Sequence, residues 1–272
     1  MPSFFKFKSR MRYFAVFTSL TALCIIATSA SAQTNIEPEI KPKSTAVSPL
    51  DFDLNNGATF NLNVTNYGFS ISGQYRRVMA RNTEWVTEAG FGTLKDPREQ
   101  TFFFFGQQLI PNKYKRVFNF PVMTGVRQRV LADFIDDNFR VFFTGMGGAS
   151  FSFAYPYFED RLALDDMPAE VQIGASRIYD VFQGWGDGDW KVGYAGKAAV
   201  SIDFGSGFST LTSLEFGVLA QYYPDGIQIM EPNTLLGTVP GSNIPVVERG
   251  TGFSAQTLFL TPTITLMFGG MW

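Results

Sequence analysis

The chain has 272 residues, of which 45% are hydrophobic and 16% aromatic but only 17% charged. A chain of this length fits one domain, since β-barrels often reach this size as a single unit. The net charge is −2, and a chain without excess positive charge lacks the basic surface that binds nucleic acid. The sequence contains no histidine, which excludes histidine-based acid, base or nucleophile chemistry.

The N-terminus has the three parts of a secretory signal peptide. Basic residues come first, then the apolar stretch YFAVFTSLTALCIIATSA, and then Ala30-Ser31-Ala32 before Gln33. A basic region, an apolar region and an A-x-A site are typical of exported proteins. We therefore expect residues 1–32 to be cleaved as a signal peptide. A retained membrane anchor is the weaker alternative, because the apolar run is short and ends in small residues.

The only cysteine of the chain, Cys24, lies inside this leader. A lipoprotein signal needs a small residue before the cysteine, and Leu23 is not small. We expect the mature protein to have no thiol, no disulfide and no lipid anchor. Cleavage would also remove four basic residues and no acidic ones, which leaves 18 basic and 24 acidic residues.

Residues 33–49 are rich in proline and polar residues and predict a flexible periplasmic lead-in. After this segment no window of about 18 apolar residues follows, so no membrane helix is predicted. The remaining residues, 50–272, show alternation of apolar and polar side chains instead. We expect them to form one domain.

The alternation is clearest in the last segment of the chain. Apolar residues there share one face, and threonines occupy the other; the apolar set is Leu258, Leu260, Pro262, Ile264, Leu266 and Phe268. A period of two residues predicts a β-strand with one apolar and one polar face. The same pattern predicts seven further strands, at 58–66, 69–79, 83–94, 117–130, 139–153, 190–204 and 209–222. Residues 65–68, TNYG, are interpreted as a turn, although a bulge within one long strand would produce the same shift of parity.

The lengths of the connections indicate the class of barrel. From the third strand onward, long connections at 95–115, 155–189 and 223–255 alternate with short ones at 131–138 and 205–208. Transmembrane β-barrels have short periplasmic turns and long external loops. The sequence therefore predicts an antiparallel transmembrane β-barrel, with eight strands favoured and ten possible.

Alternation alone does not tell a membrane barrel from a soluble one, whose apolar face points inward. Three features favour the membrane: the export signal, the loop asymmetry, and aromatic residues near predicted strand ends, such as Trp85, Tyr194 and Tyr222. We expect the apolar face to contact lipid and the polar face to line the lumen.

The C-terminus adds a resemblance to a known class. Leu266, Phe268 and Trp272 share one parity in the last strand. This ending resembles the C-terminal assembly signal of bacterial outer-membrane barrels, which implies the barrel-assembly machinery as a partner during insertion and outer-membrane lipid as the final surroundings. The stretches FFGQQLIPNKYKRVFNFP, DGIQIMEP and ITLMFGGMW resemble segments of outer-membrane proteins of Bacteroidota-type bacteria. The resemblance covers residues 50–272 and implies fold and location, and no functional residues are carried across from it.

Charged residues on the predicted luminal face form the main candidate site. They are Arg76, Glu84, Glu88, Arg127, Arg129, Arg140, Lys197, Asp203 and Glu215. Charges of both signs in so narrow a lumen are expected to pair and fill the barrel, because unpaired buried charges are costly. A binding site or a narrow ion path remains the alternative.

Two loops carry weaker signals. Loop 155–189 is acidic and contains GWGDGDW, but carboxylates at this spacing fall short of a calcium loop, so a solvated acidic loop is favoured over a Ca²⁺ site. Loop 95–115 contains Phe102 to Phe105, which predict an extended strand with aromatic packing at the rim or an exposed patch for a partner. No metal or cofactor is expected.

These observations favour a non-enzymatic outer-membrane protein with a charge-filled lumen and a structural or loop-mediated binding role. One alternative is a small channel or transporter for solutes. Another is an accessory subunit of an envelope secretion or adhesion system.

Overall fold

The computed structural model describes residues 46–104, 107–110, 112–157, 182, 184–205, 207–238, 245–248 and 250–272. The expected signal peptide and most of the expected lead-in, up to residue 45, lie outside the described residues. So do most of the acidic residues of loop 155–189.

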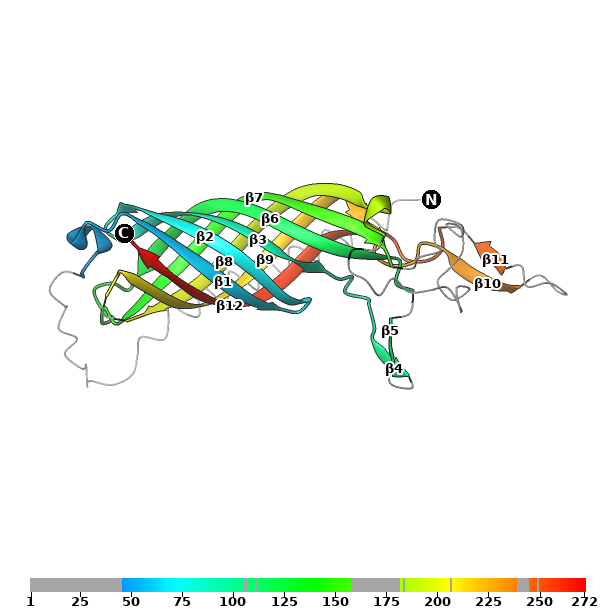
Figure 1. Ribbon diagram of the computed structural model, residues 1–272, viewed down its shortest axis with the longest axis horizontal. Coiled ribbons are helices and arrows are strands. Elements are labelled where there is room, and N and C mark those ends of the chain that lie inside the picture. The colour runs from blue at the N-terminus through cyan, green and yellow to red at the C-terminus, as the bar shows by residue number, and fades with distance from the viewer. Residues whose placement is uncertain are drawn as a thin grey trace, which may run out of the picture. The chain divides into compact units, whose positions relative to one another are not determined.

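Eight antiparallel strands form a closed barrel (Figure 1). The strands are β1 (Asn56–Thr65), β2 (Gly68–Ala80), β3 (Thr83–Leu94), β6 (Lys115–Val130), β7 (Phe139–Pro156), β8 (Asp189–Phe204), β9 (Thr210–Ile227) and β12 (Gln256–Met271). Each strand pairs with its neighbour along the chain, and β1 pairs with β12 to close the ring. The predicted fold class and the strand count of eight are confirmed.

The predicted strand positions are also confirmed, with ends that differ by a few residues. The TNYG stretch is a turn, because β1 ends at Thr65 and β2 begins at Gly68. Gly68 has a φ of 122°, a conformation that favours glycine. The closing seam between β1 and β12 is completed by Trp272, whose amide donates to the carbonyl of Asn56.

Long and short connections lie at opposite ends of the barrel. The long connections, which join β3 to β6, β7 to β8 and β9 to β12, lie at the same end as the short β1–β2 turn. The chain enters β1 and leaves β12 at the other end, beside the remaining short turns. The predicted loop asymmetry is confirmed, and these ends are called the loop end and the terminal end below.

Two of the long connections contain small hairpins of their own. Strands β4 (Phe102–Phe104) and β5 (Gln107–Leu109) pair in the first, and β10 (Thr234–Thr238) and β11 (Pro245–Glu248) pair in the last. The predicted extension of the barrel strand through Phe102 is therefore wrong, because β3 ends at Leu94 and the phenylalanines form a separate hairpin.

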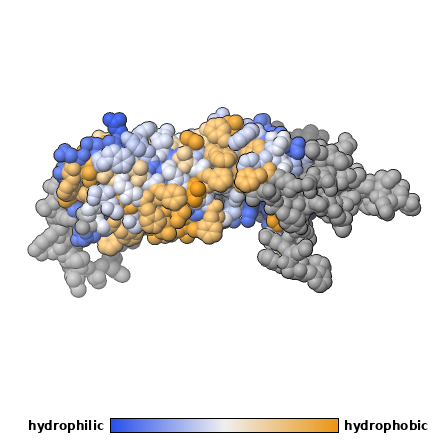
Figure 2. All heavy atoms as spheres, viewed as in Figure 1, coloured by the Kyte–Doolittle hydropathy of each residue, from blue (hydrophilic) through white to orange (hydrophobic). Residues whose placement is uncertain are grey.

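Apolar side chains lie on the outer wall of the barrel, and polar side chains lie inside it. The exposed wall residues include Phe60, Leu62, Ile71, Val122, Val126, Phe143, Val200, Phe216, Val218, Leu260, Ile264 and Leu266. Figure 2 shows apolar surface gathered along the wall, with hydrophilic residues more frequent toward the terminal end. Within the described part of the chain, no helix has both the length and the apolar character to cross a membrane.

The last residues of the expected lead-in are part of the barrel rather than a flexible segment. Ala46 and Ser48 are buried, and a 3-10 helix, η1 (Pro49–Phe52), follows them. The Ser48 hydroxyl donates to the carbonyl of Arg81, and the Arg81 guanidinium donates to the carbonyl of Ala46. These contacts fix residues 46–49 against the barrel.

Candidate functional site: the filled lumen

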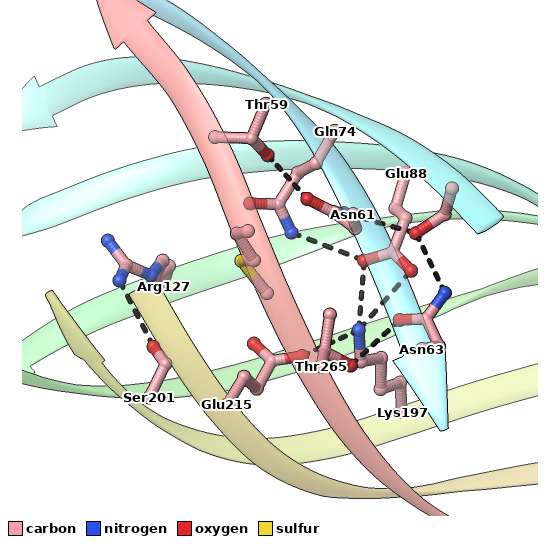
Figure 3. A network of polar contacts seen from close by, with 12 residues as sticks. Thr59, Asn61, Asn63, Gln74, Glu88, Arg127, Lys197, Ser201, Glu215 and Thr265 are labelled. Atoms are coloured by element: carbon pink, nitrogen blue, oxygen red, sulfur yellow. Dashed lines mark hydrogen bonds and ion pairs between the residues drawn. The ribbon is translucent and has the colours of Figure 1, made fainter. Parts of the chain in front are cut away.

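The centre of the lumen is occupied by one lysine and two carboxylates. The Nζ atom of Lys197 on β8 lies 2.9 Å from Oε2 of Glu88 on β3 and 2.7 Å from Oε1 of Glu215 on β9. Gln74 on β2 donates a further hydrogen bond to Glu88. Figure 3 shows the amine of Lys197 between the two carboxylates. This group is called the central cluster.

A second cluster of charges lies nearer the terminal end. Arg127 on β6 forms ion pairs with Glu84 at 3.0 Å and with Asp203. Arg76 lies 3.5 Å from Asp203 and donates a 2.7 Å hydrogen bond to Gln74, which joins the two clusters. Both arginines are fully buried. This second group is called the lower cluster, and it consists of two cations and two carboxylates: Arg76, Arg127, Glu84 and Asp203.

Arg129 and Arg140 form a third group of charges on the inner face of the barrel. They lie at the rim of the terminal end, where Arg129 pairs with Asp137 at 2.7 Å and donates to the carbonyl of Val47. Arg140 donates to the carbonyls of Asp137 and Gly205. These arginines tie the turns and the N-terminal segment together, and the single network of nine charges predicted from the sequence is divided into two luminal clusters and this rim.

Uncharged polar side chains line much of the rest of the lumen. Toward the loop end, the Tyr223 hydroxyl lies within hydrogen-bonding distance of Ser150, Ser152 and Asn119. Near the central cluster a further chain of hydrogen bonds runs through Thr59, Asn61, Ser72, Asn63 and Thr265. These residues are not among the predicted site residues, although most of them share the inward parity of the charged residues in their strands.

Apolar clusters lie at both ends of the barrel. At the terminal end, Val78, Phe208, Leu211 and Met271 pack together with Val47 and Leu54. At the loop end the cluster consists of Tyr67, Leu94, Val117, Ala154, Tyr223, Ile227, Ile229 and Phe259. These are called the terminal-end cluster and the loop-end cluster. The charges of the lumen thus lie between two apolar layers.

The first and third long connections meet above the loop-end cluster. Lys113 forms a β-bridge with Met230, and the amides of Tyr114 and Lys115 both donate to the carbonyl of Ile229. The Lys113 ammonium lies 2.7 Å from Glu99. Burial lowers the pKa of Lys113, and the attraction of Glu99 offsets this only in part. This contact is called the loop bridge.

A cavity remains between the central cluster and the loop-end cluster. Its volume is about 50 Å³, which is room for a few water molecules. The residues that line it include Glu88 and Lys197 below, Tyr67 and Leu94 above, and Gly90, Gly92, Pro121, Gln221 and Thr263 on the walls. Thr263 Oγ1 and Gln221 Oε1 are buried and have no hydrogen-bond partner among the described residues.

The residues of the predicted C-terminal assembly signal lie on the outside of the barrel. Leu266 and Phe268 lie on the outer face of β12, and the Trp272 side chain is 59% exposed. Among the described residues no group of three or more metal-ligating side chains is found. Of the acidic residues of loop 155–189, Asp187 and Asp189 are described; Asp187 is exposed, and Asp189 pairs with Lys115 at 2.9 Å.

Comparison with known proteins gives structural neighbours only. No protein-family model and no curated protein matches the sequence. Neisserial surface protein A matches with a TM-score of 0.36 at 6% identity, over 80% of this chain and 96% of that chain. The attachment invasion locus protein Ail of Yersinia pestis matches with a TM-score of 0.34 at 10% identity, over 80% of this chain and 97% of that chain. A second structure of Ail, in complex with the heparin analogue sucrose octasulfate, also has a TM-score of 0.34, at 8% identity. The resemblance to Bacteroidota-type proteins stays a prediction.

Proposed function

We propose that this protein is a non-enzymatic, integral β-barrel of the bacterial outer membrane with a closed lumen. One observation carries the membrane assignment, namely the inversion of polarity across the barrel wall. Glu215 is fully buried, whereas the next residue, Phe216, is 49% exposed on the outside. Exposing such a belt of apolar side chains to water would be unfavourable by about 25 cal/mol for each Å². In lipid the same belt is stabilising, and the polar residues are satisfied inside the ring.

The proposed role is structural or loop-mediated binding rather than solute passage. This proposal is supported by the two ion-pair clusters in the middle of the lumen and by the apolar cluster at each end. Dry apolar layers are barriers to hydrated ions and polar solutes. The parts of the chain left to contact partners are the three long connections, of which residues 95–114 and 228–255 are joined by the loop bridge.

The same proposal includes two interactions of the barrel. Outer-membrane lipid would surround the exposed belt, and the barrel-assembly machinery would bind the last strand during insertion. The interaction with the assembly machinery is supported by Leu266, Phe268 and Trp272. All three are exposed on the outside of the barrel, on or directly after the strand that closes the ring.

The test is single-channel recording of the refolded mature protein, residues 33–272, in a planar lipid bilayer. Insertion is first verified by the altered electrophoretic mobility of the folded barrel before heating. An inserted barrel without current is the expected result. Reproducible open steps would overturn the closed lumen and favour the small channel for solutes. A barrel that stays in aqueous solution without detergent or lipid would overturn the membrane assignment itself.

A further inference from the structure

Packed side chains lie on both axial sides of the lumen cavity. The loop-end cluster covers it on one side, and the two ion-pair clusters lie below it on the other. A ligand that reached the cavity along the barrel axis would have to displace packed side chains or break buried ion pairs. The barrel wall is the remaining direction of approach.

The wall has a weak point at the level of the cavity, between β3 and β6. Their ladder keeps one register from Ala89 opposite Val122 to Gly92 opposite Asn119, but the two positions between, Gly90 opposite Pro121 and Phe91 opposite Phe120, are not partners in the ladder. Pro121 lies in this gap, and proline has no amide proton to donate to a neighbouring strand. We call this unpaired stretch, residues 90–91 and 120–121, the β3–β6 seam.

The seam borders the cavity on the inside and is covered by aromatic rings on the outside. Gly90, Phe91 and Pro121 all line the cavity. On the outer wall, the Phe91 ring lies 5.2 Å from the ring of Phe120 and 5.4 Å from that of Phe118. Aromatic side chains can change rotamer without breaking backbone hydrogen bonds, so these three rings form a movable cover.

The chemistry of the cavity limits the ligand. Thr263 and Gln221 each leave a buried oxygen without a partner, and these oxygens would accept or share a hydrogen bond with a donor group. The central cluster beneath them contains two carboxylates and one ammonium, which leaves an excess of one negative charge. This charge opposes an anion. The apolar wall residues, such as Leu94 and Met123, favour a hydrocarbon portion.

We propose that the cavity binds the head group of a single-chain amphiphile that carries N–H or O–H donors and no negative charge. The ligand enters from the lipid through the β3–β6 seam once the contacting rings of Phe91 and Phe120 move apart, and its chain remains at the outer wall beside them. This inference rests on the proposed membrane insertion and goes beyond the role of the external loops.

The first test compares two probes in phosphatidylcholine nanodiscs that contain the mature protein. Dodecylamine, which is positively charged at neutral pH, is titrated against dodecanoate, which has the same number of carbon atoms and a negative charge. Amide shifts of Gly92 and Gln221 report the cavity, and those of Gly73, on the outer face of β2, report general partition into lipid. Dodecylamine is expected to shift the cavity signals at saturable concentrations, with dodecanoate at least about tenfold weaker. Equal binding of the two probes would overturn the proposed head-group chemistry, and no saturable cavity shift would overturn the site.

The second test closes the seam covalently. Residues 90 and 121 face each other in the register of β3 and β6, and a Cβ atom at Gly90 would lie 3.4 Å from Cγ of Pro121, so a Gly90→Cys/Pro121→Cys pair is the variant chosen for this cross-link. No other cysteine is present in residues 33–272. Oxidation is expected to slow dodecylamine binding at least about tenfold, and reduction of the same sample to restore it. Binding at the same rate in both redox states would overturn lateral access.

A third test fills the cavity. Gly90→Leu is expected to abolish the saturable shift, because a Cβ there meets Pro121 and Ser72 only at 3.4 Å and the side chain would extend into the cavity. Gly73→Leu is the matched control, since nothing lies within 4 Å of a Cβ at that position. Unchanged binding by folded Gly90→Leu would contradict the inference. The altered electrophoretic mobility of each folded variant shows separately that insertion, and with it the proposed membrane assignment, is intact.

Discussion

Lys197 on β8 and Glu88 on β3 meet across the interior of the barrel, with Nζ 2.9 Å from Oε2, although the two strands are three places apart in the ring. Nζ also lies 2.7 Å from Oε1 of Glu215, so one ammonium serves two buried carboxylates. The ion pairs therefore act as a strut between opposite walls.

Replacement of this lysine is expected to destabilise the barrel strongly. Lys197→Met leaves Glu88 and Glu215 without their cation, and breaking a buried ion pair from one side costs about 3–5 kcal/mol. The free energy of unfolding from lipid vesicles in guanidinium chloride, followed by tryptophan fluorescence, measures the loss.

Two further variants serve as controls for this prediction. Lys197→Met combined with Glu88→Gln and Glu215→Gln should recover most of the stability, because no uncompensated charge is left. Lys115→Met should cost less than about 1 kcal/mol, because its partner Asp189 is largely exposed. A Lys197→Met variant as stable as Lys115→Met would contradict the role of the strut.

Removal of a charge from the lower cluster is expected to weaken the barrel without opening it. Arg127→Met breaks the ion pairs with Glu84 and Asp203, but the apolar clusters at both ends remain. Planar bilayer recordings should therefore stay silent while the free energy of unfolding falls. Arg77→Met, on the outer face of the same barrel, serves as the control. Open steps in Arg127→Met alone would show that the charges, and not the apolar clusters, close the lumen.

The terminal tryptophan is expected to affect assembly more than stability. Its backbone makes the hydrogen bonds to Asn55 and Asn56, and its side chain is largely exposed. Trp272→Ala should thus refold normally into vesicles but accumulate as unassembled chain in cells. The folded fraction in isolated outer membranes, read from electrophoretic mobility, measures this. Trp190→Ala, which removes a similarly exposed ring far from the C-terminus, should assemble normally. An equal defect in both variants would count against a specific signal.

The loop bridge is expected to become more stable as the pH rises above neutral. Burial lowers the pKa of Lys113 below its value of 10.5 in an open chain, so the closed loops bind this proton more weakly than the open loops do. Protonation of Lys113 therefore favours opening of the loop bridge. The free-energy cost of burying the protonated amine disappears as the pH rises from the lowered pKa toward 10.5. The ¹³C shift of the lysine ε-carbon, assigned with Lys113→Arg, should titrate below that of the other lysines. A midpoint at or above 10.5 would show that Glu99 outweighs burial.

Most of the barrel could be predicted because the alternation of its strands and the lengths of its loops are both visible in short stretches of the sequence. A two-residue period predicts opposite faces for adjacent residues, and Glu215 is buried inside the barrel while Phe216 is exposed on its outer wall. Loop lengths then distinguished the two ends. Neither inference needs knowledge of which strands are neighbours across the lumen.

The site could be predicted only in part. The pairing of Lys197 with Glu88 joins residues 109 positions apart, and it depends on the tilt and stagger of the closed ring, which periodicity does not encode. The loop-end cluster could have been found, since Leu94, Val117 and Phe259 are apolar residues with inward parity near strand ends. The placement of residues 46–49 could not be predicted, because their contacts with Arg81 and Arg129 exist only once the strands have brought these arginines to the rim of the barrel.

The pairing of β1 with β12 has a consequence for how the chain folds. The partners Leu62 and Leu266 are separated by nearly the whole barrel sequence, so this seam forms only after the last strand has been delivered. Contacts so distant along a chain are slow to form because a large loop must close first. Until then both edge strands present unpaired backbone groups, which are prone to aggregation in water. Ring closure should therefore be the late, rate-limiting step of biogenesis, and a holding chaperone would be needed before the chain reaches the membrane.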